Sequence, residues 1–297
     1  MSQIQDATIM IALAEERHFG KAAERCHMSS SAMTRAVQRI ESQLAVALFE
    51  RDNRSVSLTP HGEQYLKFCR KTLAEWEILQ SRLRMNANAP SGQLSVYCSV
   101  TAVYSLLEPL VSACREKYPD IELLLHTGDQ ADAVQRVLEH REQVAIAACP
   151  PTLPDSLEFL PILSSPFVLI QPKELSTALE ELMPTDVARS WSKVPVVLPE
   201  RGLGRERMEQ FFKQMKQKPN IYANVTGHEA VVAMVALGCG IGGVPKIVVD
   251  SSPQRDRVAA LESPKEFAPF EIGLICHKRQ KQNAIVRAFW ELAEGTR

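Results

Sequence analysis

Short hydroxyl side chains stand next to cationic and amide side chains in the segment ERCHMSSSAMTRAVQRIESQL, residues 24–44. Ser29 is a good helix N-cap, because its hydroxyl can accept a hydrogen bond from a free backbone N–H of the first turn. One cap needs one serine, so the neighbouring hydroxyls are available to contact another molecule. The side chains here that we expect to contact DNA are Ser30, Ser31, Thr34, Arg35, Gln38 and Arg39. Such donors read base edges when the N-terminal end of a helix enters the major groove.

Three helical patterns must position these side chains. Residues 4–16 carry apolar side chains at helical spacing, and residues 18–27 predict a short helix. Residues 30–44 carry the apolar stripe Met33, Val37, Ile40 and Leu44 opposite the polar face. A short helix, a tight turn and a longer helix with a polar outer face are typical of a helix-turn-helix. An ordinary helical hairpin with a solvated face fits the same pattern and stays open as an alternative.

A small basic hairpin is expected directly after the third helix. Asp52-Asn53 is a turn signal between the short runs LFER and SVSL, and Arg51 and Arg54 bracket the tip. Beside a helix-turn-helix, such a wing can reach phosphates or the minor groove. Residues 17–71 hold ten Lys and Arg against five Asp and Glu in a chain of net charge −1, which indicates a polyanion near the N-terminus.

The next helix is expected to begin with Thr59 as N-cap and Pro60 as its first residue, and to end near Asn86. Its larger side chains step by four and three residues, which is a heptad seam typical of helix pairing. We expect this seam to hold a dimer together, although packing against the chain's own core is the alternative. Its members are Tyr65, Cys69, Thr72, Trp76, Leu79 and Leu83.

The C-terminal two-thirds of the chain alternate between strand and helix patterns, which predicts parallel, doubly wound sheets. Two such units are expected, the second inserted in the first, with crossings near residues 162–166 and 266–270. Ligands of open α/β sheets bind beyond the carboxyl ends of the strands. Arginines and helix N-termini suit a carboxylate. The candidate effector-binding residues are Ser99, Val100, Thr101, Thr127, Asp129, Arg205, Arg207, Thr226 and His228. Simple helix capping is the alternative role for the serines and threonines, and a cap or surface position is the alternative for His228.

Catalysis, metal binding and a membrane span find little support. The chain has no Gly-x-Ser-x-Gly, His-Glu-x-x-His, Walker or Gly-x-Gly-x-x-Gly motif, so we expect no enzyme. Cys239 follows a helix, and a helix C-terminus is the wrong pole to stabilise a thiolate. Seven scattered cysteines without Cys-x-x-Cys favour a reducing cytoplasm and give no zinc pattern. No apolar run approaches the length of a membrane span, and the N-terminus lacks the pattern of a signal peptide.

The N-terminal motifs resemble those of the LysR-type transcriptional regulators. The matching pieces, in family order, are Ala22-Ala23, Ser29, Thr34-Arg35, Ile40-Glu41, Leu48-Phe49-Glu50-Arg51 and Leu58-Thr59-Pro60-His61-Gly62. Their order and spacing are specific together, although each piece is weak alone. The chain departs from the family pattern at Ala45, where glycine is usual. It departs again at Ser30, where many members carry glutamine, so the operator sequence cannot be carried over.

The resemblance implies an α plus α/β architecture. A winged helix-turn-helix in residues 1–59 would be followed by a linker and dimerisation helix with a hinge in 60–91. An effector-binding domain, similar to periplasmic binding proteins, would occupy 92–297. Its subdomain I would comprise 92–161 and 269–297, and its subdomain II 162–268.

The segments FERDNRSVSLT, CSVTAVYS, HTGDQADAV and IYANVTGHEAVVAMVALGCGIG resemble more particularly the members that activate branched-chain amino acid biosynthesis. That resemblance implies acetolactate or acetohydroxybutyrate as the small-molecule inducer, bound between the subdomains with Thr101 as a polar contact. It also implies a double-stranded DNA operator, RNA polymerase as a partner, and a cytoplasmic homodimer or tetramer. The alternatives are a regulator of another pathway that senses a different small carboxylate, and an α/β binding protein that does not bind DNA.

DNA readout can be tested by comparing two arginine variants. Arg35→Ala should cost about 1–3 kcal/mol of operator binding, concentrated on particular bases, because its guanidinium is expected to reach base edges. Arg51→Ala should weaken binding to all sequences alike and flatten its salt dependence, because a phosphate contact carries no sequence information. Wild-type operator affinity of Arg35→Ala in a binding titration would contradict the assignment.

Overall fold

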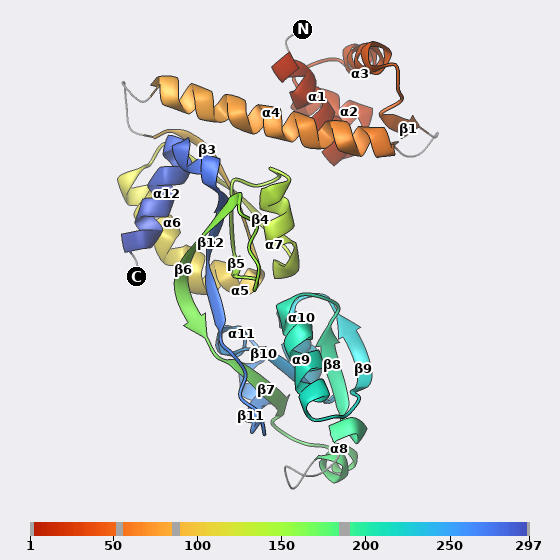
Figure 1. Ribbon diagram of the computed structural model, residues 1–297, viewed down its shortest axis with the longest axis vertical. Helices are drawn as coiled ribbons and strands as arrows, with labels where there is room; N and C mark the ends of the chain where they lie inside the picture. The colour runs from red at the N-terminus through yellow and green to blue at the C-terminus, as the bar shows by residue number, and fades with distance from the viewer. Residues whose placement is uncertain (1–2, 52–55, 85–89, 184–190, 296–297) are drawn as a thin grey trace. The chain divides into compact units, whose positions relative to one another are not determined.

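The computed structural model describes residues 3–51, 56–84, 90–183 and 191–295 (Figure 1). The chain forms two compact units, whose main bodies are the described residues up to 84 and those from 90 onward. No helix among the described residues is both long enough and apolar enough to cross a membrane.

The N-terminal unit contains the predicted helix-turn-helix and wing. Its elements are α1 (Gln3–Glu16), α2 (Phe19–Arg25), α3 (Ser30–Leu44), β1 (Phe49–Arg51) and β2 (Val56–Leu58). The predicted apolar stripe of α3 is confirmed at Met33, Val37 and Ile40, which are buried against Met10 and Leu13 of α1. Ser29 caps α3, and its hydroxyl accepts from the N–H of Ala32 at 3.2 Å. The prediction for Leu44 is wrong, because its side chain is exposed.

Glu41 fixes the wing to the end of α3. Its Oε1 accepts from the backbone N–H groups of Leu48 at 2.9 Å and Phe49 at 3.2 Å, at the point where β1 begins. Between the end of α3 and the start of β1 the chain turns at Ala45, whose φ of +56° lies in the left-handed region that favours glycine. The alanine at this helix end therefore occupies a backbone conformation for which the usual family glycine is better suited.

The long helix α4 (Pro60–Arg84) begins against the wing. The Thr59 hydroxyl accepts from the N–H of Gly62 at 2.9 Å and donates to the carbonyl of Ala47 at 2.8 Å. A Cβ on Gly62 would lie 2.0 Å from the Leu48 carbonyl oxygen, so only glycine permits this close approach. The described part of α4 ends at Arg84, and the predicted end near Asn86 lies outside the described residues.

The heptad seam of α4 needs correction at its start. Cys69 is only 1% exposed and Tyr65 packs beside it, so both belong to the core of the helix-turn-helix. The exposed apolar stripe of α4 comprises Phe68, Trp76, Leu79 and Leu83, with half-buried Thr72 between the first two. Phe68, which is 56% exposed, therefore replaces Cys69 in the surface that a second helix could cover.

The first sheet of the C-terminal unit has the strand order β4-β3-β5-β12-β6. Its strands are β3 (Gly92–Cys98), β4 (Ile121–Thr127), β5 (Val144–Ala148), β6 (Leu157–Ser165) and β12 (Phe270–His277). The helical segments between and after them are α5 (Val100–Ala102), η1 (Val103–Leu107), α6 (Glu108–Lys117), η2 (Gln130–Asp132), α7 (Ala133–Leu138), η5 (Lys278–Gln282) and α12 (Ala284–Gly295). β3 runs parallel to β4 and β5, whereas β12 runs antiparallel to β5 and β6.

The second sheet has the order β11-β7-β10-β8-β9. Its strands are β7 (Phe167–Pro172), β8 (Pro195–Pro199), β9 (Asn220–Val225), β10 (Ile241–Pro245) and β11 (Val258–Leu261). Its helical segments are α8 (Thr177–Leu182), η3 (Trp191–Lys193), α9 (Leu203–Gln214), α10 (His228–Ala236), α11 (Lys246–Asp250) and η4 (Arg255–Arg257). The apolar face of α10 packs Val231, Val232 and Val235 against Val197 of β8 and Val244 of β10.

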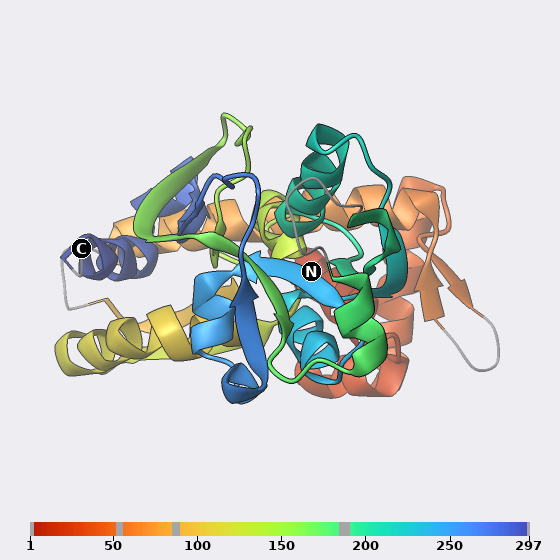
Figure 2. The same ribbon diagram turned by 90° about the horizontal axis from the view of Figure 1, so that it is seen from below.

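Two chain segments connect the sheets. β6 and β12 lie side by side in both views (Figures 1 and 2), with Ser165 opposite Phe270 in their register. The chain passes into the second sheet at Pro166 and returns before Phe270. The first crossing therefore follows the end of β6, and residues 162–165, which we placed in subdomain II, belong to the first sheet.

The sequence patterns missed several elements of these sheets. β6, β10 and β11 were not expected, and the strands β7, β11 and β12 run antiparallel to neighbours in sheets that were expected to be parallel. β10 lies in the glycine-rich run that we interpreted as a helix terminator. A Cβ on Gly243 would lie 2.3 Å from the sulfur of Met208, and one on Gly242 would lie 2.5 Å from Val231. These glycines let helices pack closely on a central strand.

Two substitutions in α4 should separate pairing from core packing. Leu79→Glu places a charge on the exposed stripe, so the protein should stay folded and become monomeric. Cys69→Ala removes a buried group, so it should lower the free energy of unfolding by about 1 kcal/mol and leave the mass unchanged. Sedimentation measures the mass, and an unchanged mass for Leu79→Glu would refute pairing through this stripe.

Candidate DNA-reading face and effector cavity

The polar face of α3 is exposed as the sequence predicted. Ser30, Ser31, Arg35 and Gln38 are all exposed, and they lie on the side of the helix opposite its buried stripe. Thr34 is half-buried, and its hydroxyl donates to the Ser30 carbonyl at 2.9 Å. The first turn of α3 therefore presents small hydroxyl groups, followed by the longer side chains of Arg35 and Gln38.

Arg39 has a structural partner within the N-terminal unit. Its guanidinium donates to both carboxylate oxygens of the buried Asp6, with Nη1 at 3.1 Å from Oδ2, which ties α3 to α1. This ion pair gives Arg39 a role in the packing of the helices, and its expected contact with DNA stays a prediction. Arg51 lies in β1 with its side chain outside the described residues, and Arg54 lies outside them altogether. Their expected contacts with DNA stay predictions.

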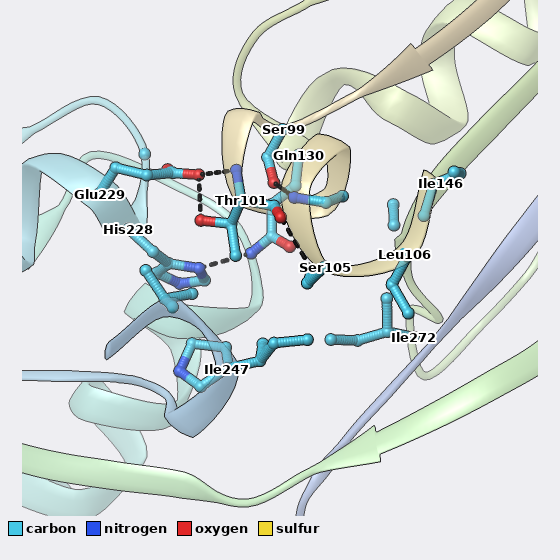
Figure 3. A pocket seen from close by; sticks show the side chains of 15 residues that line it. Ser99, Thr101, Ser105, Leu106, Gln130, Ile146, His228, Glu229, Ile247 and Ile272 are labelled. Carbon is cyan, nitrogen blue, oxygen red and sulfur yellow. Dashed lines mark hydrogen bonds between the residues drawn. The ribbon is translucent and has the colours of Figure 1, made fainter. Parts of the chain in front are cut away.

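A small cavity lies where the first turns of α5 and α10 face each other (Figure 3). Its volume of about 30 Å³ has room for roughly two water molecules. Its polar side is formed by Ser99, Thr101, Ser105, Gln130, His228 and Glu229. Its apolar side is formed by Ala102, Leu106, Ile146, Ala147, Pro245, Ile247, Val248 and Ile272. Of the nine predicted effector-binding residues, the structure brings Ser99, Thr101 and His228 to this cavity.

Thr101 is buried and is hydrogen-bonded to Glu229 through both its backbone and its side chain. Its backbone N–H and its hydroxyl both donate to Oε1 of Glu229, at 3.0 and 2.7 Å. Burial raises the pKa of the Glu229 carboxyl, but hydrogen bonds from Thr101 and from the backbone of Glu229 itself act in the opposite direction, and the pKa lies below its ordinary value. Ser99 caps α5, and the hydroxyl of Ser105 donates to the Thr101 carbonyl at 2.8 Å. The carboxylate of Glu229 is thus held ionised between the two sheets.

His228 is buried and neutral. Gln130 Nε2 donates to its Nδ1 at 2.8 Å, and burial lowers the pKa of the imidazole to about 4. A Cβ on Gly204 would lie 2.1 Å from His228 Nε2, so the start of α9 packs directly on the ring. The cap or surface interpretation of His228 is wrong, because Gly227 is the N-cap of α10 and His228 is buried. His228 lines the cavity, and its expected contact with an effector stays a prediction.

Four other predicted residues lie away from the cavity wall. Val100, Thr127 and Thr226 are exposed, and the Thr226 hydroxyl donates to Glu200 at 3.1 Å. Asp129 caps η2 by accepting from the N–H of Ala131 at 3.0 Å. Asp129 also lies 3.4 Å from the guanidinium of Arg201, a residue that the sequence patterns did not single out.

Arg205 and Arg207 do not reach the cavity, contrary to our expectation. Arg205 donates to the Pro199 carbonyl, to Asn224 Oδ1 and to Glu209 Oε1, at 2.7–3.0 Å. Arg207 donates to the carbonyls of Ala268 and Pro269, and its guanidinium lies 4.5 Å from the centre of the Phe270 ring. Arg205 therefore stabilises the ends of β8 and β9, Arg207 stabilises the segment that leads into β12, and neither side chain lines this cavity.

Gln130, Glu229 and Ser105 are cavity residues that sequence reasoning missed. Gln130 directly follows the predicted Asp129, and Glu229 directly follows the predicted His228, so the sequence identified both loops without selecting these two side chains. Ser105 lies one helical turn after Thr101, and this spacing was the signal that could have identified it.

A winged helix-turn-helix combined with a two-sheet α/β unit around a small cavity, polar on one side and apolar on the other, is typical of a ligand-responsive DNA-binding protein. The chain belongs to the LysR family of bacterial transcriptional regulators. Residues 4–63 match "Bacterial regulatory helix-turn-helix protein, lysR family", and residues 87–296 match "LysR substrate binding domain". The protein is therefore a transcriptional regulator with a DNA-binding domain and a ligand-binding domain, and it is not an enzyme.

Individual relatives are similar over nearly the whole chain. The "HTH-type transcriptional activator IlvY" of Salmonella typhimurium is 39% identical over 292 residues, which cover 97% of this chain and 98% of the relative. The activator of the same name in Haemophilus influenzae is 37% identical over 98% of this chain and 100% of its own length.

Solved structures show the same fold. A full-length OxyR variant of Pseudomonas aeruginosa superposes with a TM-score of 0.70 at 22% identity and covers 100% of this chain and 95% of its own. Full-length CbnR in complex with its target DNA gives a TM-score of 0.64 at 24% identity, with 100% of both chains covered.

The buried imidazole of His228 should make the stability depend on pH. The pKa of a histidine in the unfolded chain is about 6.5, whereas burial lowers the pKa of His228 to about 4, so between these pH values the unfolded chain binds the additional proton. Stability should therefore fall as the pH falls, and lowering the pH from 7 to 5 should cost about 2 kcal/mol through this group. Urea unfolding of the full chain at both pH values measures this loss.

His228→Gln should remove that part of the pH dependence, and His61→Gln, whose side chain is exposed, should retain it. The same loss of stability in His228→Gln and wild type would show that His228 is not the group responsible.

Proposed function

We propose that the protein is a sequence-specific activator of branched-chain amino acid biosynthesis that responds to acetolactate or acetohydroxybutyrate. The similarity to activators named IlvY, 37–39% identical over nearly the full length, supports this assignment. The observation that carries the effector's chemical class is the division of the cavity into one polar and one apolar side.

A short, branched hydroxy-keto acid suits both sides of this cavity. Its carboxylate requires N–H and O–H donors, which Thr101 supplies. Its hydroxyl and keto oxygens can use the Ser99 hydroxyl and the amide of Gln130, and its methyl or ethyl group can contact Leu106, Ile146 and Ile272. Acetolactate and acetohydroxybutyrate contain all of these groups.

Effector binding must change the arrangement around the cavity, because space for about two water molecules does not hold such a molecule. The polar wall combines Thr101 beside the first sheet with His228 and Glu229 at the start of α10 on the second. A ligand that contacts both sheets favours one arrangement of the sheets over others and shifts the population towards it. The coupling to DNA binding should be on the order of 1–3 kcal/mol.

The DNA-binding function places α3 in the major groove, with Arg35 and Gln38 near base edges. A dimer or tetramer, paired through the exposed stripe of α4, would space two such helices one or more DNA turns apart. Activation further implies RNA polymerase as a partner. A rearrangement in the ligand-binding domains would then change how the reading helices lie on the operator.

Thr101→Val tests the effector assignment. Valine keeps the shape of threonine and removes the hydroxyl, so the variant should lose activation by acetolactate while it keeps operator binding. The measurement is promoter activity against the concentration of freshly prepared acetolactate. Thr127→Val is the matched control, because Thr127 is exposed and away from the cavity, and it should respond as wild type does.

Identical activation curves for Thr101→Val and wild type would contradict the role of Thr101. A wild-type protein that binds its operator and ignores both acetolactate and acetohydroxybutyrate would instead favour a different small carboxylate as effector.

A further inference from the structure

The two donors that suit an effector carboxylate are already used by a carboxylate of the chain itself. Oε1 of Glu229 accepts from both the N–H and the hydroxyl of Thr101, and Figure 3 shows the Glu229 side chain extending from α10 to this point. Each of these donors carries a single proton, so neither can serve a second carboxylate while Glu229 stays in place.

We propose that Thr101 forms a carboxylate seat, that Glu229 occupies it as a resident competitor, and that the effector binds by displacing Glu229. This inference rests on the proposed function, because it takes the effector to be a small carboxylate. It assigns to Glu229 the role of setting the effector concentration at which the protein responds.

The charges around the cavity favour replacement of the Glu229 carboxylate by the ligand carboxylate over binding of both at once. The described residues that line the cavity include no lysine or arginine, and His228 is neutral because burial lowers its pKa. A ligand carboxylate beside the ionised Glu229 would therefore face an uncompensated like charge. When the Glu229 carboxylate moves away as the ligand binds, one negative charge still accepts hydrogen bonds from the N–H and the hydroxyl of Thr101.

The volume of the cavity also favours displacement of Glu229. The cavity has room for about two water molecules, and Glu229 forms part of its wall. Rotation of the Glu229 side chain out of the seat would vacate the volume of a carboxymethyl group. One motion thus frees the donors, removes the repulsion and provides room for a larger molecule.

Chemical rescue by acetate tests the seat independently of the effector. Glu229→Ala removes a carboxymethyl group, which has the size and charge of acetate. Acetate should therefore raise the melting temperature of full-length Glu229→Ala in a saturable manner, by about 3 °C. It should have no such effect on wild type, on the double variant Glu229→Ala/Thr101→Val, or on Glu209→Ala, which removes an exposed glutamate of α9. Equal effects of acetate on Glu229→Ala and Glu209→Ala would overturn the proposal.

Calorimetric titration with acetolactate tests displacement. If Glu229 fills the seat in most molecules, its removal should raise the affinity about tenfold, because the binding-competent fraction increases. Glu229→Gln, which keeps the shape without the charge, should raise it less and guards against misfolding of the alanine variant. Acetoin, which lacks the carboxylate, should not gain affinity from either substitution. Weaker or unchanged acetolactate binding by both variants would mean that Glu229 contacts the ligand or is irrelevant to it, and would overturn displacement.

The two experiments separate this proposal from the proposed function. Rescue by acetate without any binding of acetolactate would retain the seat and reject acetolactate as effector. Binding of acetolactate to wild type, without rescue or a gain in affinity, would retain the effector and reject Glu229 as its competitor.

Discussion

The hydrogen bonds from Thr101 to Glu229 are the interaction on which the ligand-binding unit depends. They connect the segment after β3 in the first sheet to the first turn of α10 beside the second sheet. Because Glu229 is held ionised there, a negative charge lies next to the neutral imidazole of His228, and the Glu229 side chain forms part of the cavity wall. Ligand chemistry, cavity volume and the arrangement of the two sheets are therefore linked through one carboxylate.

In the N-terminal unit, side chains outside the exposed polar face of α3 hold this candidate DNA-reading face in position. Asp6 binds Arg39 and so fixes the orientation of α3 against α1. Glu41 binds the backbone at the start of β1, and Gly62 lets α4 approach the same loop. These contacts give the family motif a physical basis, because several of its residues act by fixing backbone and leave Arg35 and Gln38 free to face outward.

Local sequence patterns were sufficient to predict most helices and strands, but they did not predict which side chains pack against one another. The stripe of Met33, Val37 and Ile40 identified the buried face of α3, and Ser29 was correctly recognised as its cap. Heptad spacing could not reveal that Cys69 packs into the helix-turn-helix core, because the neighbouring α1 that helps to cover it is distant in sequence. β10 was missed because glycines normally end helices, whereas here they accommodate Met208 and Val231.

Contacts between residues distant in sequence were also missed at the cavity. Strand ends predicted Ser99, Thr101 and His228 correctly as neighbours in space. Ser99 and Thr101 follow β3 of the first sheet and His228 follows β9 of the second, and residues beyond the carboxyl ends of both strands line the cavity. Charge alone favoured Arg205 and Arg207 as partners of a ligand carboxylate, but both are held by carbonyl oxygens elsewhere. The role of Glu229 required the fold, because its partner Thr101 lies more than a hundred residues away in sequence.

A crystal structure of the full-length protein with acetolactate bound would test the displacement of Glu229 most directly. We expect a ligand carboxylate oxygen within hydrogen-bond distance of the Thr101 N–H and hydroxyl, with the Glu229 side chain turned out of the seat. A bound ligand at another position, with Glu229 still on Thr101, would contradict displacement.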